Sequence, residues 1–211
     1  VEAPVIIFIH GFPLNKSMWE MQSEALKAEY RVITYDVRGH GDSESGPDHF
    51  SIDLFVSDLI CFMNDLTINK AVLCGLSMGG YIALNAVINY PDLFDALILC
   101  DTSCAADTIE AKHKRIIAIE DIKINGVEDF ADNNIKNLFA KESLNSKGSE
   151  IELVREMIIK TSIQSLYNSM HALAVRKETC SRLPLIKIPV LILVGIDDKI
   201  TPLSAAKAMH V

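Results

Sequence analysis

The sequence predicts an α/β fold in which a mostly parallel, doubly wound sheet carries an inserted group of helices. Apolar runs typical of buried strands alternate with helical patterns, and such alternation produces parallel sheets with right-handed crossovers. From about residue 102 to residue 183 the strand signal disappears and only helical periodicity remains. We therefore expect a first core section over 1–101, a helical cap over 102–183 and a second core section over 184–211.

The expected strands are short runs rich in apolar and β-branched residues. Most of them are apolar at consecutive positions, which is typical of strands buried on both faces of a sheet. The five runs cover 5–9, 31–35, 71–76, 96–100 and 190–194. In a sheet of this kind, a functional site forms at the edge where the strands end.

Helical patterns fill the intervals between these strands, at 17–27, 52–66, 78–89 and 202–210. The inserted section has two further apolar faces at helical spacing, one from Ile151 to Ile158 and one from Ile163 to Ala174. Because this section begins where a strand ends, we expect it to cover the site.

Composition narrows the functions that this chain can have. Its 211 residues suit one large domain with an inserted lobe, and a formal net charge of -8 argues against a nucleic-acid partner. No stretch approaches the roughly 18 apolar residues of a membrane span, and no signal segment opens the sequence, so we expect a cytoplasmic protein. The five cysteines are widely spaced without a CxxC pair, which favours buried free thiols over disulfides or a metal site.

The strongest chemical signal is Gly75-Leu76-Ser77-Met78-Gly79. An apolar strand runs into Gly-x-Ser-x-Gly and then directly into a helix, which is the setting of a nucleophile elbow. The turn is strained, and glycines are needed where side chains would collide with neighbouring backbone. We expect Ser77 to be a nucleophile and the Met78 N–H to bind an oxyanion. The alternative is a serine in a tight turn without a catalytic role.

A second strand ends in His10-Gly11-Phe12-Pro13. Gly11 would let the backbone turn back towards the elbow, so that the Phe12 N–H joins that of Met78 in an oxyanion hole. His10 could be a general base, but a histidine at a strand end more often braces the loop by hydrogen bonds.

A third strand, which ends at Tyr35, leads into a charged, glycine-rich loop. We expect Asp36 and Arg38 to lock this loop by a charge-assisted hydrogen bond, and contact with the substrate is the alternative. His40 and His49 lie in or near polar segments, and we expect both of them to be solvated.

The motifs together resemble the α/β-hydrolase superfamily, and within it the branch of capped esterases, 3-oxoadipate enol-lactonases and cofactor-free haloperoxidases. The residues that carry the resemblance are His10-Gly11-Phe12-Pro13, Asp36-x-Arg38-Gly39-x-Gly41-x-Ser43, Gly75-x-Ser77-Met78-Gly79-Gly80 and Gly195-x-x-Asp198-x-x-Thr201-Pro202. The resemblance implies an acid after the strand that follows the cap, to orient a catalytic histidine. Asp198 matches this position, and Asp197 is the neighbouring alternative.

The resemblance also implies that the catalytic histidine follows the acid in the chain. Only His210 does so, about 12 Å along a helix that leads away from the site. We therefore expect the base to lie beyond Val211. A hairpin that usually precedes the first strand is missing as well, so the sequence is expected to be truncated at both ends, and the 211-residue segment alone to be inactive or nearly so.

The expected activity is hydrolysis of a small carboxylic ester or lactone through an acyl-enzyme on Ser77, without a metal ion or an organic cofactor. Serine at the elbow argues against the haloalkane dehalogenase and epoxide hydrolase branches, which the resemblance associates with aspartate there. Perhydrolase or haloperoxidase-like activity and C–C bond hydrolysis stay open. So does a ligand-sensing protein on the same fold with little turnover.

The expected substrate pocket is small and mostly apolar. Besides Phe12 and Met78, it would be lined by Met157, Ile158, Leu166 and Met170 of the cap. The alternative for these four residues is ordinary helix–helix core. Unpaired strand edges also leave a homodimer open.

Overall fold

The computed structural model describes residues 3–47 and 49–210, and the expected strands form one sheet. They are β1 (Val5–Ile9), β2 (Arg31–Tyr35), β3 (Ala71–Leu76), β4 (Phe94–Cys100) and β5 (Val190–Leu193). The order is β2-β1-β3-β4-β5, and all four neighbouring pairs are parallel. The chain reverses its direction across the sheet between β1 and β3. Ligands of parallel sheets bind at such a switch point, beyond the carboxyl ends of the strands.

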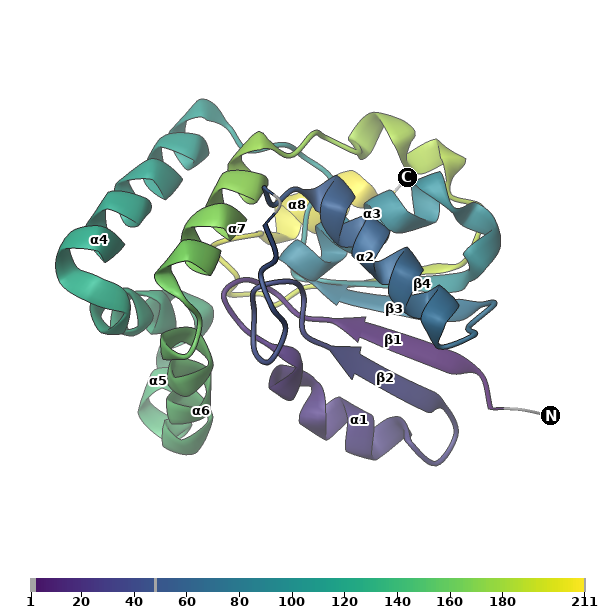
Figure 1. Cartoon of the computed structure of the whole chain (residues 1–211), viewed down its shortest axis with the longest axis horizontal. Coiled ribbons are helices and arrows are strands. Elements are labelled where there is room, and N and C mark those ends of the chain that lie inside the picture. Colours follow the sequence, from purple (N-terminus) through teal and green to yellow (C-terminus); the bar gives the residue numbers. More distant parts are fainter. Residues whose placement is uncertain (1–2, 48, 211) are drawn as a thin grey trace.

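Helices cover both faces of this sheet (Figure 1). The helices α2 (Ile52–Asp65) and α3 (Met78–Asn89) share one apolar cluster with one face of the central strands, and α8 (Leu203–Met209) adds Met209 to it. On the opposite face lie the 3₁₀ turn η1 (Lys16–Trp19) and α1 (Glu20–Leu26), where Trp19 packs against Phe8. Successive strand residues point to opposite faces, which is why both clusters draw on the same strands. The predicted doubly wound sheet is confirmed.

The chain between β4 and β5 is helical, as the sequence predicted. It forms α4 (Ile109–Leu138), α5 (Lys141–Ser146), α6 (Gly148–Ile159) and α7 (Ile163–Val175), followed by the 3₁₀ turn η3 (Cys180–Leu185). We refer to α4–α7 as the insert. Figure 1 shows it beside the edge of the sheet to which the arrows of β1 and β2 point. No helix in the described part of the chain is long and apolar enough to cross a membrane.

The cysteines do not all behave as the sequence predicted. Cys104 and Cys180 form a disulfide across 76 positions of sequence, so the expectation of free thiols is wrong for these two residues. Cys61, Cys74 and Cys100 are free, but Cys61 is exposed. The pairing was invisible in the sequence because the two residues meet only where the chain leaves the core and where it returns to it.

Candidate active site

Ser77 lies in the sharp turn between β3 and α3. Its φ of 51° and ψ of -108° are unusual for a residue with a side chain, and such strained conformations persist only where their surroundings fix them. Here the end of β4 does so. The Ser77 N–H donates to the Cys100 carbonyl at 3.0 Å, and the Thr102 hydroxyl donates to the Ser77 carbonyl at 2.8 Å. The turn is therefore tied to the neighbouring strand on both sides of Ser77.

Glycines around Ser77 let this turn pack more closely than side chains would allow. A Cβ atom at Gly75 would lie 2.3 Å from the carbonyl oxygen of Gly79, and one at Gly79 would lie 2.2 Å from that of Ile9. At Gly80 the added atom would lie 2.4 Å from the Thr102 hydroxyl oxygen. Because these contacts are far too short for real atoms, only glycine lets α3 begin directly against β1 and β4.

The loop after β1 passes directly beside this turn. A Cβ atom at Gly11 would lie 3.4 Å from the Ser77 Cβ and 3.2 Å from the Leu76 carbonyl oxygen. Neither the Phe12 N–H nor the Met78 N–H donates a hydrogen bond to another described residue. For Met78 this follows from its place in the first turn of a helix, where N–H groups have no intrahelical acceptor. The Phe12 and Met78 N–H groups are therefore two available donors, and the segments that carry them meet at Ser77.

His10 holds the loop after β1 in place. It is completely buried, its Nε2 accepts a hydrogen bond from the Val37 N–H at 2.9 Å, and its Nδ1 donates to the Gly11 carbonyl at 3.0 Å. Burial lowers the pKa of His10 to about 4. At neutral pH the ring is therefore uncharged, and both of its nitrogens are occupied by the backbone.

His40 is buried rather than solvated, so its predicted exposure is wrong. Its Nε2 lies 2.9 Å from the Ser169 hydroxyl of α7, and its ring packs edge-on against His10 and Phe12. Burial lowers the pKa of His40 to about 3. The prediction missed this because the polar loop is covered by the insert, whose position the sequence does not give. His49 is exposed, as expected.

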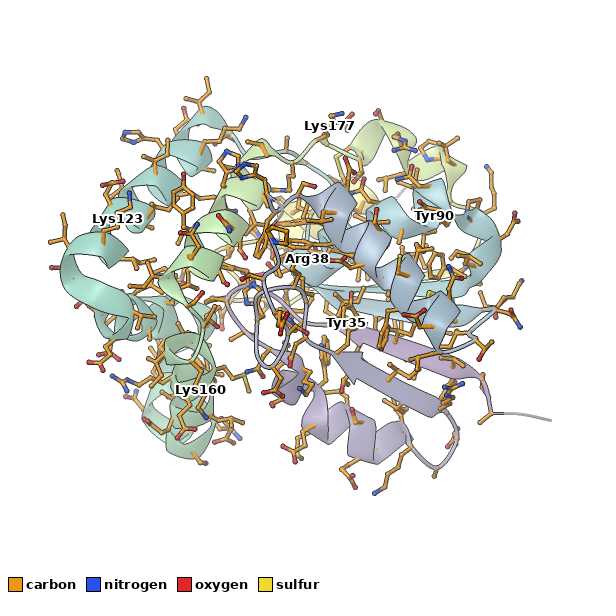
Figure 2. The ribbon with its side chains drawn as sticks, in the orientation of Figure 1. Tyr35, Arg38, Tyr90, Lys123, Lys160 and Lys177 are labelled. Carbon is orange, nitrogen blue, oxygen red and sulfur yellow. A yellow bond between two sulfur atoms is a disulfide. The ribbon has the colours of Figure 1, made fainter. Side chains whose placement is uncertain are left out.

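The expected hydrogen bond between Asp36 and Arg38 does not form. The Asp36 carboxylate instead accepts from the Lys16 ammonium at 2.6 Å, the Lys16 N–H at 2.7 Å and the Asp42 N–H at 2.9 Å. Arg38 instead donates to both carboxylate oxygens of Asp58 in α2. Figure 2 labels Arg38 beside this helix. The prediction was wrong because each side chain finds a partner on a different helical segment, and those segments come together only in the fold.

Replacing Asp36 by asparagine should lower the stability of the fold and change its response to acid. Burial alone would raise the pKa of Asp36, but hydrogen bonds from Lys16 and Asp42 outweigh it and hold the pKa below its usual value. A carboxyl with a depressed pKa stabilises the fold above its unfolded pKa of about 4, and this stabilisation is lost as the pH falls through the folded pKa. We expect Asp36→Asn to lower the free energy of unfolding at pH 7 by roughly 1.5–3 kcal/mol.

Urea unfolding of the wild type and Asp36→Asn at pH 7 and in steps below pH 4 measures this effect. The difference between the two proteins should shrink as the pH falls. Asp42→Asn serves as the control, because the Asp42 side chain is 91% exposed and its ion pair should contribute less than about 1 kcal/mol. A difference that stays constant down to the lowest pH would contradict the assignment.

The expected acid, Asp198, lies in the loop after β5. Its Oδ1 accepts hydrogen bonds from the N–H groups of Ile200 and Thr201 at 2.7 and 3.0 Å, and its Oδ2 accepts from the Thr201 hydroxyl. The carboxylate is thus held in one orientation just before α8 begins. Asp197, the neighbouring alternative, is exposed.

Asp101 is a residue of this region that the sequence reading missed. It follows β4 directly, has a φ of 42°, and its Oδ1 accepts a hydrogen bond from the Gly195 N–H at 2.7 Å. A Cβ atom at Gly195 would lie 3.6 Å from that oxygen and 3.9 Å from the Asp198 Cβ, so the two carboxyl side chains flank Gly195. Burial and the charge of Asp198 raise the pKa of Asp101. An acidic residue directly after an apolar strand was the signal that could have revealed it.

No histidine in residues 3–47 and 49–210 hydrogen-bonds to the Ser77 hydroxyl. His210 is exposed at the end of α8, where its N–H donates within that helix. It borders a hollow of about 280 Å³ whose apolar lining includes Leu84 and Leu183. Within the same described residues there is no cluster of three side chains suited to a metal ion.

The residues expected to line a pocket lie in the core of the insert. Met157, Ile158, Leu166 and Met170 are all buried in one apolar cluster, which also contains Leu14 and Phe130. Phe12 packs against this cluster, with its ring centroid 6.4 Å from that of Phe130. The insert and the loop beside Ser77 are therefore in contact, while the assignment of these four residues to a pocket stays a prediction.

Comparison with known proteins gives a consistent result. The alpha/beta hydrolase fold family matches residues 4–210. Among curated proteins, the chain is 29% identical to 3-oxoadipate enol-lactonase 1 of Acinetobacter baylyi, an alignment that covers 99% of this chain and 76% of the relative. It is 33% identical to the AB hydrolase superfamily protein YisY of Bacillus subtilis, over 97% of this chain and 78% of the relative.

Among solved structures, the chain is similar to a thermophilic esterase from Thermogutta terrifontis. The TM-score is 0.93 and the identity 34%, over 99% of this chain and 77% of the esterase. The enol-lactonase from Burkholderia xenovorans gives a TM-score of 0.92 at 25% identity, over 99% of this chain and 79% of that structure.

Proposed function

Because the chain belongs to the alpha/beta hydrolase fold family, we propose that it is a serine hydrolase that cleaves a small carboxylic ester or lactone through an acyl-enzyme on Ser77. The family match confirms the superfamily that the motifs indicated. One observation supports a catalytic role for Ser77 in particular. The strained turn holds Ser77 at the switch point of the sheet, and the Gly11–Phe12 loop lies against this turn. Similarity to proteins named as an esterase and as enol-lactonases supports the substrate class.

In the proposed reaction the Ser77 Oγ attacks the carbonyl carbon of the substrate. The Phe12 and Met78 N–H groups donate hydrogen bonds to the oxyanion that develops. Donors that are already fixed in position stabilise such a charge most effectively. A histidine base takes the proton of Ser77 and gives it to the departing alkoxide, which for a lactone stays attached to the acyl group. Water then attacks the acyl-enzyme by the same route and releases the acid. No described histidine occupies the place of this base.

We assign Asp198 as the acid that orients this base. Its carboxylate is anchored by the backbone of Ile200 and Thr201, so its position does not depend on the substrate. A carboxylate held in this way stabilises the imidazolium form that arises during proton transfer. The insert would then close the site from above, with Phe12 and Met157, Ile158, Leu166 and Met170 on the apolar side of the substrate.

A covalent probe tests the proposal directly. A fluorophosphonate ester forms a P–O bond to an activated serine and releases fluoride. The full-length protein should gain the mass of one phosphonyl group, located by peptide mass spectrometry on Ser77, and should lose p-nitrophenyl acetate hydrolysis in proportion to labelling. Ser103→Ala is the matched control, since Ser103 is a half-buried serine after β4, and it should label as the wild type does.

The p-nitrophenyl acetate assay also distinguishes a hydrolase from a ligand-sensing protein on the same fold. Sustained release of many equivalents of p-nitrophenol per protein supports a hydrolase, whereas a ligand sensor stops after a few. Absence of labelling, or labelling at another serine, would contradict the role of Ser77.

A further inference from the structure

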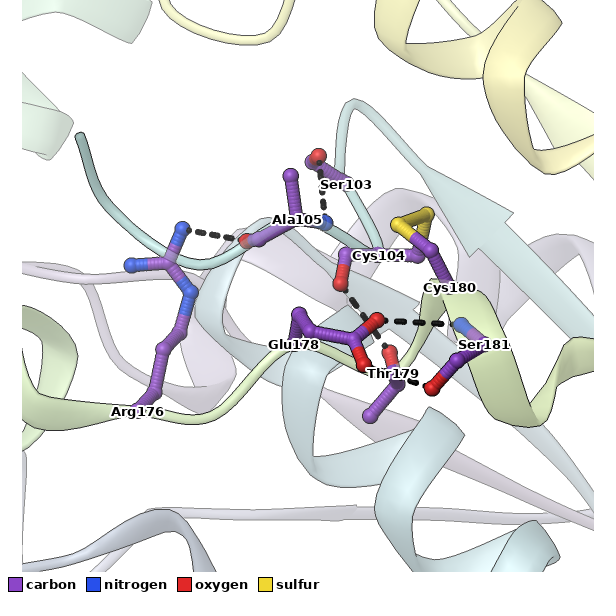
Figure 3. Close-up of a disulfide and its surroundings, with 8 residues drawn as sticks. All are labelled: Ser103, Cys104, Ala105, Arg176, Glu178, Thr179, Cys180 and Ser181. Carbon is purple, nitrogen blue, oxygen red and sulfur yellow. Dashed lines mark hydrogen bonds between the residues drawn. A yellow bond between two sulfur atoms is a disulfide. The ribbon is translucent and has the colours of Figure 1, made fainter.

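The two segments that join the insert to the core run side by side and are bonded to each other. We call them the neck, which comprises residues 102–108 on the way out and 176–180 on the way back. Figure 3 shows the Cys104–Cys180 disulfide that links them. Both the N–H and the hydroxyl of Thr179 also donate to the Cys104 carbonyl, at 2.7 and 3.3 Å. All four helices of the insert lie within the loop that this disulfide closes.

A buried ion pair fastens the neck a second time. Arg176 donates to the Asp107 carboxylate and, at 3.0 Å, to the Ala105 carbonyl on the outgoing segment. Asp107 also accepts from Arg115 of α4 at 2.6 Å. The side chains of Arg176 and Asp107 are only 7% and 5% exposed. An unpaired charge that is buried this deeply is very unfavourable. Arg176 and Asp107 can therefore separate only if the two segments of the neck also move apart.

Charge–charge contacts keep Asp107 ionised. Burial alone would raise the pKa of Asp107, but the hydrogen bonds and charges of Arg115 and Arg176 outweigh it and hold the pKa below its usual value. The ion pair is therefore complete at neutral pH.

The neck also touches the turn that carries Ser77. The Arg176 guanidinium stacks on the Tyr81 ring at 4.1 Å, and the Tyr81 N–H donates to the Ser77 carbonyl at 3.2 Å. Thr102, at the start of the outgoing segment, donates to the same carbonyl. Both segments of the neck therefore contact the elbow or the first turn of the helix that follows it.

Beyond the neck, the insert contacts the core mainly through α7 and through the loop after β1. Its helices α4, α6 and α7 share an apolar cluster, to which the core contributes Leu14 together with the partly buried Phe12 and Met18. The α7 residues Ala172 and Leu173 are buried in the core cluster instead. The hydrogen bond between His40 and Ser169 is a further link. Most of the buried apolar residues of α4 and α6 therefore pack within the insert, so the neck has a large share in fixing where these helices lie relative to the core.

We propose that the neck acts as a clamp that limits the size of the substrate. In this proposal the Cys104–Cys180 bond and the Arg176–Asp107 ion pair hold the insert closed over Ser77, so that only small acyl groups fit in the site. This inference rests on the proposed hydrolase function. A dithiol opens the clamp by transferring two electrons and two protons. The S–S bond breaks, Cys104 and Cys180 become thiols, and the dithiol becomes a cyclic disulfide.

The test compares a short and a long ester on the full-length protein. The ratio of kcat/KM for p-nitrophenyl octanoate to that for p-nitrophenyl acetate should rise at least about tenfold in Cys104→Ser, and equally in wild type treated with dithiothreitol, because a wider pocket favours the longer chain. Cys61→Ser is the matched control, since Cys61 is free, and its ratio should not change. Treatment of the folded wild type covers the case in which Cys104→Ser fails to fold.

A second readout does not depend on activity. Dithiothreitol should expose two additional titratable thiols and accelerate hydrogen exchange in α4–α7, but not in β1, β3 and β4. Arg176→Lys, which keeps the charge but not the forked hydrogen bonds, should produce a smaller acceleration. Unchanged exchange and an unchanged ester ratio after loss of the disulfide would overturn the clamp. Failure of Ser77 labelling would instead overturn the hydrolase assignment and leave the exchange result standing.

Discussion

Replacing Ser77 by alanine should lower kcat/KM for p-nitrophenyl acetate by about 10⁵-fold, which corresponds to roughly 7 kcal/mol of lost transition-state stabilisation. The substitution removes the attacking oxygen and leaves only the oxyanion donors and the binding site. Those elements alone accelerate hydrolysis far less than a complete nucleophile does. The loss should appear in kcat, because alanine leaves room for the same substrate.

The fold of Ser77→Ala should be preserved, so the loss is not caused by unfolding. The hydrogen bonds that fix the turn use the N–H and the carbonyl of Ser77, and alanine retains both. Circular dichroism and the thermal midpoint check this point, and Ser103→Ala provides a serine replacement that should leave activity unchanged. A Ser77→Ala protein that keeps more than a tenth of the activity would mean that the nucleophile lies elsewhere.

Much of the fold could be predicted because its signals are local. A run of consecutive apolar residues predicts a strand, and each of the five strands supplies its own run. The expectation of burial on both faces is wrong for the edge strands, because β2 is only partly buried and β5 is mostly exposed. β4 begins at Phe94, two residues earlier than expected, because the intervening Asp95 is exposed and interrupts the apolar pattern. The turn at Ser77 was equally visible, since the glycines that it requires lie within a few positions of it.

The contacts that the sequence did not reveal join segments that are far apart in the chain. His40 is buried by Ser169, 129 positions later, and Cys104 meets Cys180 after 76 positions. Asp36 and Arg38 each pair with a residue 20 positions away rather than with each other. Residue type and local periodicity carry no information on such pairs, because the partner is set by how the insert and the helices pack on the sheet.

Asp198→Asn should lower kcat/KM by about 10⁴-fold, because a neutral amide cannot stabilise the imidazolium ion and can hold the imidazole in the wrong tautomer. The local structure should survive. The asparagine carbonyl can accept from the N–H groups of Ile200 and Thr201, and the amide can donate to the Thr201 hydroxyl oxygen, in place of the present bonds. The expected loss is therefore chemical rather than structural, and an unchanged thermal midpoint would verify this.

Two neighbouring carboxylates make the Asp198 experiment decisive. Asp197→Asn changes an exposed side chain and should alter kcat/KM by less than about twofold. Asp101→Asn keeps an acceptor for the Gly195 N–H but removes the charge beside Asp198, so its effect should stay below about tenfold. If the large loss followed Asp101→Asn or Asp197→Asn instead, that residue would be the acid. In the case of Asp101, the catalytic histidine would be oriented from the end of β4, the strand that already holds the Ser77 turn in place.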